Sequence, residues 1–134
     1  MTADASPAFR GLTPMLRTRD LDAAIAFYLD RLGFALQRRS DADGWASLRR
    51  DGIELMLSAF NAHEGDEATP FTGSLYLRCD DVDAWWDRLR DIAPVCYPIE
   101  NFDYGMREFA VRDPNGFLLQ FGQPTDDPPD THER

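Results

Sequence analysis

Cysteine, histidine, positive charge and long hydrophobic runs are all scarce in this sequence. Two cysteines, Cys79 and Cys96, are too few for a disulfide framework, so we expect a cytoplasmic protein. No apolar run is long enough to span a bilayer, and the N-terminus lacks the basic and apolar segments of a secretory signal. With 134 residues the chain can bury a core without disulfides, which predicts a single domain.

The shortage of positive charge restricts the partners of the protein. Fourteen basic residues stand against 24 acidic residues, which gives a net charge of −10. Such a surface repels phosphate backbones and anionic lipids, so we expect neither nucleic acid nor a membrane as a partner. A cationic small molecule is compatible with this negative field.

The two ends of the chain differ in composition from the part between them. Residues 1–10 are small and polar, which predicts a flexible arm. Residues 124–134 are acidic and interrupted by prolines, which predicts a disordered tail. The folded body is therefore expected at residues 11–123.

The first half of this body has the pattern of one helix among four strands. Residues 20–32 carry apolar side chains at helical spacing, with Asp20 as a cap and Gly33 as the stop. Residues 12–18 predict a strand, and Pro14 favours a place at the edge of a sheet. Alternation and turn sequences then predict an antiparallel meander of strands at residues 34–39, 45–49 and 53–60.

The same order of elements returns after a loop at residues 61–73. Leu16-Arg17 before Asp20 is echoed by Leu77-Arg78 before Asp81, at an offset of 61 residues. The second set of predicted elements is a helix at 81–89 and strands at 74–79, 95–97, 106–112 and 117–123. These patterns predict an α+β protein of two β-α-β-β-β modules, residues 11–61 and 72–123, rather than a solenoid, which needs more copies.

Three pieces of sequence carry a family likeness: Arg19-Asp20-Leu21 with Ala26-Phe27-Tyr28, then Arg31-Leu32-Gly33-Phe34, and residues 105–116, GMREFAVRDPNG. With these motifs the duplicated unit resembles the vicinal oxygen chelate superfamily, which includes glyoxalase I, extradiol dioxygenases and bleomycin-resistance proteins. Residues 105–116 are most similar to the bleomycin-resistance branch. The resemblance implies eight strands in half-barrel sheets, a site on their concave faces, and a homodimer.

Metalloenzymes of this superfamily place ligands on the first and last strands of each half. The resemblance maps those positions to Thr13, Ser74, Gln120 and either Glu54 or Met56. Anchoring on Gly52 and Gly116 selects Met56, and anchoring on the Ile-Glu-Leu string selects Glu54; both registers remain open. Either set offers at most one carboxylate and no imidazole, so we expect no metal and no cofactor. The histidines, His63 and His132, fall in a loop and in the tail.

Glu54 has two interpretations. If it faces the cavity, it is a candidate to bind a ligand amine or to act as a lone general base. In the other interpretation it is a solvated or arginine-paired glutamate on a half-exposed face. Arg107 and Glu108, which are adjacent in the sequence, are interpreted separately as a structural strand pair.

Four aromatic residues lie outside the apolar stripes of the helices: Trp45, Phe60, Phe102 and Tyr104. In bleomycin-resistance proteins, aromatics at the positions of Trp45 and Tyr104 line a cleft at the dimer interface and stack on a planar drug. Aromatic faces also attract cations, which fits a planar or cationic ligand. The alternative for each of them is a place in the core or at its rim.

These observations favour a metal-free protein that sequesters a small molecule, such as a cationic antibiotic, in a dimer cleft. The candidate ligand-binding residues are Trp45, Glu54, Met56, Phe60, Phe102, Tyr104 and Gln120. The alternative is a metal-dependent lyase, isomerase or dioxygenase of the same superfamily that uses Glu54. The sequence leaves open which ligand is bound and whether the dimer is domain-swapped.

Overall fold

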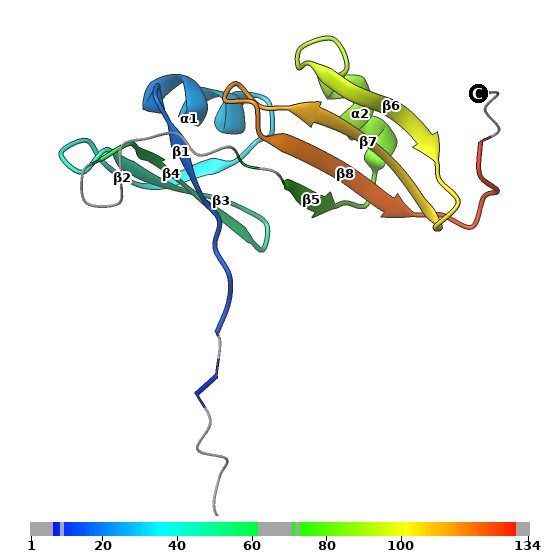
Figure 1. The fold of residues 1–134 in the computed structure, drawn as a ribbon, viewed down its shortest axis with the longest axis horizontal. Helices are drawn as coiled ribbons and strands as arrows, with labels where there is room; N and C mark the ends of the chain where they lie inside the picture. Colours follow the sequence, from blue (N-terminus) through cyan, green and yellow to red (C-terminus); the bar gives the residue numbers. More distant parts are fainter. Residues whose placement is uncertain (1–6, 9, 62–70, 72, 131–134) are drawn as a thin grey trace, which may run out of the picture.

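A computed structural model describes residues 7–8, 10–61, 71 and 73–130; both histidines and most of the predicted arm lie outside these ranges. The order of elements is β-α-β-β-β repeated twice, as the sequence predicts (Figure 1). The elements are β1 (Met15–Thr18), α1 (Leu21–Asp30), β2 (Ala35–Ser40), β3 (Trp45–Arg50), β4 (Ile53–Ala59), β5 (Ser74–Arg78), α2 (Val82–Leu89), β6 (Val95–Asn101), β7 (Met106–Arg112) and β8 (Leu118–Pro124). Neither helix of the described part is long and apolar enough to cross a membrane.

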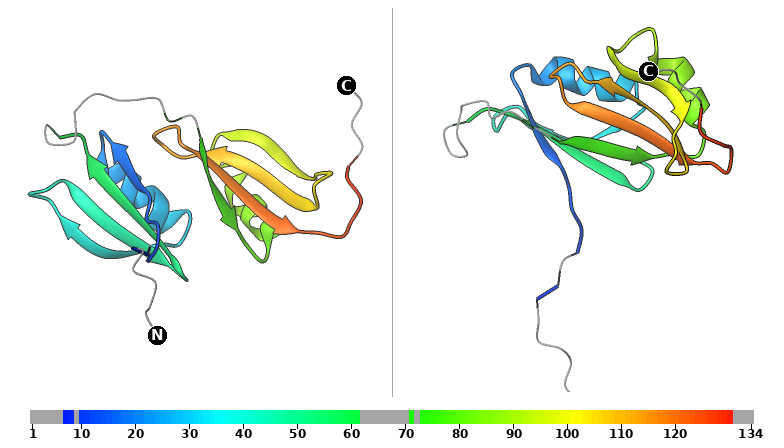
Figure 2. Two further views of the ribbon diagram at one scale, coloured as in Figure 1. Left: turned by 60° about the horizontal axis from the view of Figure 1, so that its bottom comes forward. Right: turned by 45° about the vertical axis from the view of Figure 1, so that its right-hand side comes forward.

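The eight strands form two four-stranded sheets of identical topology. The strand orders are β1-β4-β3-β2 and β5-β8-β7-β6. In each sheet the first and last strands of the module pair in parallel, and the other pairs are antiparallel. Figure 2 shows the two sheets side by side, each accompanied by its helix. The strand after Pro14 lies at a sheet edge, as expected for a strand next to a proline.

Both helices begin with the same N-terminal cap, an aspartate, which supports the internal repeat. The carboxylate of Asp20 accepts a hydrogen bond from the backbone N–H of Ala23 at 3.0 Å, and Asp81 accepts one from Ala84 at 3.2 Å. Helix α1 ends two residues before the predicted end, because the chain turns into Gly33, whose φ is 74°.

Strand β6 is longer than the sequence predicts. It runs from Val95 to Asn101 and therefore through Pro98, where the prediction stopped at residue 97. Since β6 is an edge strand with an irregular register, the missing N–H of a proline is tolerated there. Beyond β8, the backbone N–H of Asp130 donates to the carbonyl of Asn101 at 2.9 Å. This part of the predicted tail therefore follows the end of β6.

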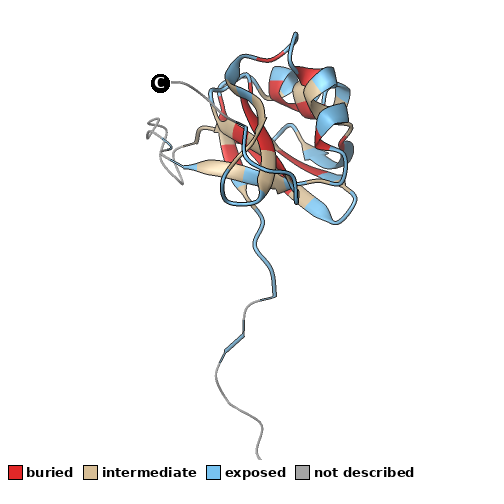
Figure 3. Cartoon of the chain, turned by 90° about the vertical axis from the view of Figure 1, so that its right-hand side faces the viewer, coloured by how far each residue is buried: buried red, intermediate tan, exposed pale blue. Residues whose placement is uncertain are grey.

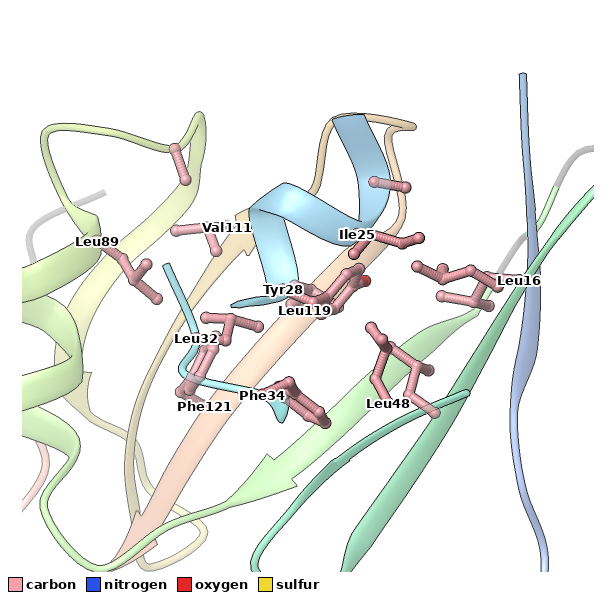
Figure 4. Close-up of a cluster of buried hydrophobic side chains, with 14 of the residues drawn as sticks. Leu16, Ile25, Tyr28, Leu32, Phe34, Leu48, Leu89, Val111, Leu119 and Phe121 are labelled. Carbon is pink, nitrogen blue, oxygen red and sulfur yellow. The ribbon is translucent and has the colours of Figure 1, made fainter. Parts of the chain in front are cut away.

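One hydrophobic core extends through both halves. Figure 3 shows the buried residues gathered where helices and sheets face each other. In Figure 4, Tyr28 of α1 and Leu32, which follows the end of this helix, lie beside Leu119 and Phe121 of β8, so that the first half packs on the second sheet as well as on its own. The hydroxyl of Tyr28 donates to the buried carboxylate of Asp113 at 2.8 Å. Burial and this neighbouring carboxylate raise the pKa of Tyr28 above its ordinary value, so the phenol remains a donor.

Arg50 forms a second connection between the halves. Its guanidinium donates to the carbonyls of Leu32 and Gly33, at 3.2 and 3.3 Å, and lies 5.2 Å from the ring centroid of Trp85 on α2. A β-carbon at position 33 would lie 2.0 Å from Nη1 of Arg50. Glycine at this position therefore provides both the left-handed backbone and the space for the guanidinium.

We expect Tyr28→Phe to lower the free energy of unfolding by about 1–3 kcal/mol, because it removes a hydrogen bond to a buried carboxylate. Urea denaturation followed by circular dichroism measures this change. Asp91→Ala is the control: Asp91 is exposed, so its change should stay within about 0.5 kcal/mol. An unchanged midpoint for Tyr28→Phe would contradict the role of this contact.

Candidate functional site

Each sheet packs one face against the helices and leaves its other face free of helices. On β8, Leu119 and Phe121 are buried in the core, whereas Leu118 and Gln120 point to the opposite side. The same alternation on β4 buries Leu55 and Leu57 and turns Glu54 and Met56 to the other side. The helix-free faces therefore carry the residues that the sequence assigns to a concave binding face.

The strand register decides between the two alignments of the halves. Met15 pairs with Met56 in the first sheet, and its repeat counterpart Tyr76 pairs with Gln120 in the second. Met56 is therefore the structural counterpart of Gln120, and Glu54 is the counterpart of Leu118. This is the register anchored on the two turn glycines.

The residues at the metal positions of the superfamily do not fit a metal. In this register they are Thr13, Met56, Ser74 and Gln120, which offer hydroxyl, thioether and amide groups. Protein sites for zinc, iron, nickel and manganese depend on imidazole, thiolate or carboxylate ligands. Within the ranges that the structure describes, no three histidine, cysteine or acidic side chains gather as a metal-ligand group.

Glu54 combines features of both interpretations of the sequence. Its carboxylate accepts a hydrogen bond from the Ser47 hydroxyl at 2.8 Å and lies 3.5 Å from Nη2 of Arg49. It also lines a cavity of about 340 Å³ between the two halves, together with Ser74 and Tyr76 of the second half. Glu54 is thus arginine-paired and faces a cavity at the same time.

A larger cavity of about 480 Å³ lies where the turn after β3 meets the start of α2. Arg50, Cys79 and Trp85 are among the residues that line it. Burial raises the pKa of the Cys79 thiol to about 11, so this cysteine is not an activated nucleophile at neutral pH.

Two of the predicted aromatic residues lie together in the second half. The rings of Phe102 and Tyr104 stack with centroids 5.3 Å apart and an interplanar angle of 14°. The ring of Tyr97 meets Phe102 edge-on at 5.7 Å. Tyr104 is 58% exposed, so the outer surface of this cluster is open to solvent.

The other predicted aromatic residues belong to the first half. Trp45 pairs with Ser58 on the helix-free face, and Phe60 lies under the guanidinium of Arg19 at 4.3 Å. Among the described rings, none joins Trp45 to Phe102 or Tyr104. A single chain thus brings Phe102 and Tyr104 together but does not bring Trp45 to them.

Arg107 and Glu108 make structural contacts, but with different partners and not with each other. Neighbours on a strand point to opposite faces. Arg107 forms an ion pair with Asp83 of α2 at 2.9 Å. The carboxylate of Glu108 lies on the helix-free face, where it accepts hydrogen bonds from the hydroxyls of Tyr76, at 2.6 Å, and Tyr97.

Glu108 is the inner end of a hydrogen-bond network that the sequence analysis missed. The hydroxyl of Ser74 donates to Gln120, the amide of Gln120 donates to the hydroxyl of Tyr97 at 2.8 Å, and Tyr97 donates to Glu108. Burial and hydrogen bonds to Glu108 raise the pKa values of Tyr76 and Tyr97. Burial and the negative charge of Glu108 raise the pKa of Tyr104 to about 12. The phenols therefore stay protonated. Alternation along β7 could have placed Glu108 on the helix-free face, but no sequence signal indicates its tyrosine partners.

Residues 12–121 match the Glyoxalase/Bleomycin resistance protein/Dioxygenase superfamily, and the chain belongs to it. Within this superfamily, a bleomycin resistance protein from Klebsiella pneumoniae is 35% identical over 119 residues, which cover 83% of this chain and 90% of that protein.

Two solved structures extend this similarity. The bleomycin resistance determinant encoded on transposon Tn5 is 28% identical, with a TM-score of 0.67 over 87% of this chain and 98% of that one. The bleomycin-binding protein of bleomycin-producing Streptomyces verticillus, complexed with copper(II)-bleomycin, is 26% identical, with a TM-score of 0.63 over 91% of this chain and 100% of that one.

Gly122 makes the approach of Tyr76 to Glu108 possible. A β-carbon at position 122 would lie 2.2 Å from the Tyr76 hydroxyl oxygen. We expect Gly122→Ala to destabilise the protein by about 1–3 kcal/mol through overpacking. In the background of Tyr76→Ala the same change should cost much less, and a double-mutant cycle of urea unfolding energies measures the difference.

Gly52→Ala is the matched control for this cycle, because a β-carbon there meets nothing within 4 Å. Equal costs of Gly122→Ala with and without Tyr76 would show that the tyrosine ring does not occupy this space.

Proposed function

We propose that this protein binds a planar or cationic small molecule, as bleomycin resistance proteins do, and protects by sequestering it rather than by converting it. The observation that carries the proposal is the 35% identity to a bleomycin resistance protein along most of both chains. The chemistry of the helix-free faces supports it, because these faces present aromatic rings and hydrogen-bond acceptors in a molecule of net charge −10.

A metal-dependent lyase, isomerase or dioxygenase is the weaker alternative. Glu54 is the one carboxylate among its candidate ligands, and Arg49 and Ser47 already engage it. An enzyme of this kind needs a polarising metal and a base at one centre. The free thiols of Cys79 and Cys96 favour a reducing, cytoplasmic location for the binding protein.

The binding cleft in this proposal belongs to a homodimer. Trp45 lies on β3 in the first half and Tyr104 lies in the turn between β6 and β7 in the second half, so a second copy is needed to set one ring opposite the other. Exposed apolar side chains on the first sheet and in the segment before it are available for such contact: Leu12, Met15 and Ile53. Twofold symmetry would give two identical clefts, each with Trp45 from one chain and Tyr104 from the other.

We expect a bleomycin-type glycopeptide to bind with saturable heat in isothermal titration calorimetry at micromolar concentration. Trp45→Ala should weaken binding about 3- to 10-fold through lost stacking. Trp86→Phe is the control, because Trp86 packs on Phe109 in the core. Absence of saturable heat with the unmodified protein would contradict the glycopeptide as ligand.

A mixing experiment tests the shared cleft. Trp45→Ala and Tyr104→Ala variants should each bind weakly, whereas dimers that contain one chain of each regain one intact cleft. After exchange of subunits, roughly a quarter of all clefts should bind with the original affinity. Sedimentation of the unmodified protein as a monomer, or no regained binding in a mixture that has exchanged, would contradict the shared cleft.

A further inference from the structure

Glu108 is a buried carboxylate that has no cationic partner in the part of the chain that the structure describes. It is 1% exposed although it lies on the face that no helix covers. The chain has no lysine, and the arginines of the described part form no ion pair with Glu108. Glu100 stands directly opposite it on β6, an arrangement of like charges that is unfavourable in a sheet. A buried charge in this setting has to be stabilised by its surroundings.

The surroundings of Glu108 are aromatic. The phenols of Tyr76 and Tyr97 donate to its two carboxylate oxygens, and burial together with the negative charge of Glu108 raises the pKa of Tyr104. Phe102 joins the rings of Tyr97 and Tyr104 into one cluster. The carboxylate therefore lies behind a wall of aromatic rings and adds its negative potential to theirs.

The rings of this aromatic wall differ in whether an arginine lies over them. The guanidinium of Arg78 lies 5.6 Å from the ring centroid of Tyr76. Over the rings of Tyr97, Phe102 and Tyr104, by contrast, the described part of the chain places no arginine. These three rings are the part of the wall that can receive a positive charge from outside.

We propose that the rings of Tyr97, Phe102 and Tyr104, backed by the carboxylate of Glu108, form a subsite for an alkylated ammonium group. The inference rests on the proposed function and specifies the cationic part of its ligand. Glu108 is covered and already accepts phenol hydrogen bonds, so a ligand N–H cannot reach it directly. A charge that carries methyl groups and is weakly hydrated fits such a wall, because it interacts with ring faces and needs no acceptor.

Choline and its neutral isostere 3,3-dimethyl-1-butanol test the subsite, because they share one shape and differ in charge. Chemical-shift titration by NMR should show saturable binding of choline at millimolar concentration, about fivefold or more tighter than binding of the neutral compound. Glu108→Gln should remove most of this preference, and Tyr104→Ala should weaken choline binding. Asp91→Asn, which removes an exposed carboxylate after α2 on the helix side of the second sheet, should leave the preference intact.

Equal affinity of the two compounds for the unmodified protein would overturn the subsite, as would a folded Glu108→Gln variant that keeps the preference. If Glu108→Gln does not fold, Tyr104→Ala decides, since Tyr104 is 58% exposed: unchanged choline binding would then overturn the proposal. Glycopeptide binding without a choline preference would overturn the subsite alone. A choline preference without glycopeptide binding would support the subsite and contradict the glycopeptide as ligand.

Discussion

The contacts that α1 and the turn after it make with the second half connect the two sheets. Tyr28 reaches from this helix to Asp113, a residue 85 positions later in the chain, and both groups are buried. Leu32 and Leu119 continue the same contact as part of one core. The direction in which each helix-free face points is therefore fixed by a helix on the opposite side of the sheet. The core therefore also determines the geometry of any site that these faces form.

The two modules share a topology but present different chemistry. On the first sheet, Glu54 is partly accessible and is surrounded by Ser47 and Arg49. On the second sheet, Glu108 is covered by tyrosines. A carboxylate neutralised by a neighbouring guanidinium attracts a cation weakly, whereas one that is only hydrogen-bonded keeps its field. The duplicated scaffold thus allows each face to specialise.

Much of the fold could be predicted from local signals. Asp20 and Asp81 mark the helix starts, Gly33 marks a helix end, and the repeat of these signals indicates two modules. The extension of β6 through Pro98 could not be predicted, because a proline normally argues against a strand and the exception depends on its place at an edge. The network around Glu108 could not be predicted either. It depends on the register that sets Glu108 opposite Gly122, where the missing side chain admits a tyrosine from another strand.

The contact between Gly33 and Arg50 also restricts how this sequence can change over evolution. Any side chain at position 33 collides with the guanidinium, and loss of Arg50 removes the donor that bonds the carbonyls of Leu32 and Gly33. A substitution at either position therefore changes the contacts of the other. Replacements at positions 33 and 50 are therefore expected to have non-additive effects on stability, so that the cost of one depends on whether the other has already changed.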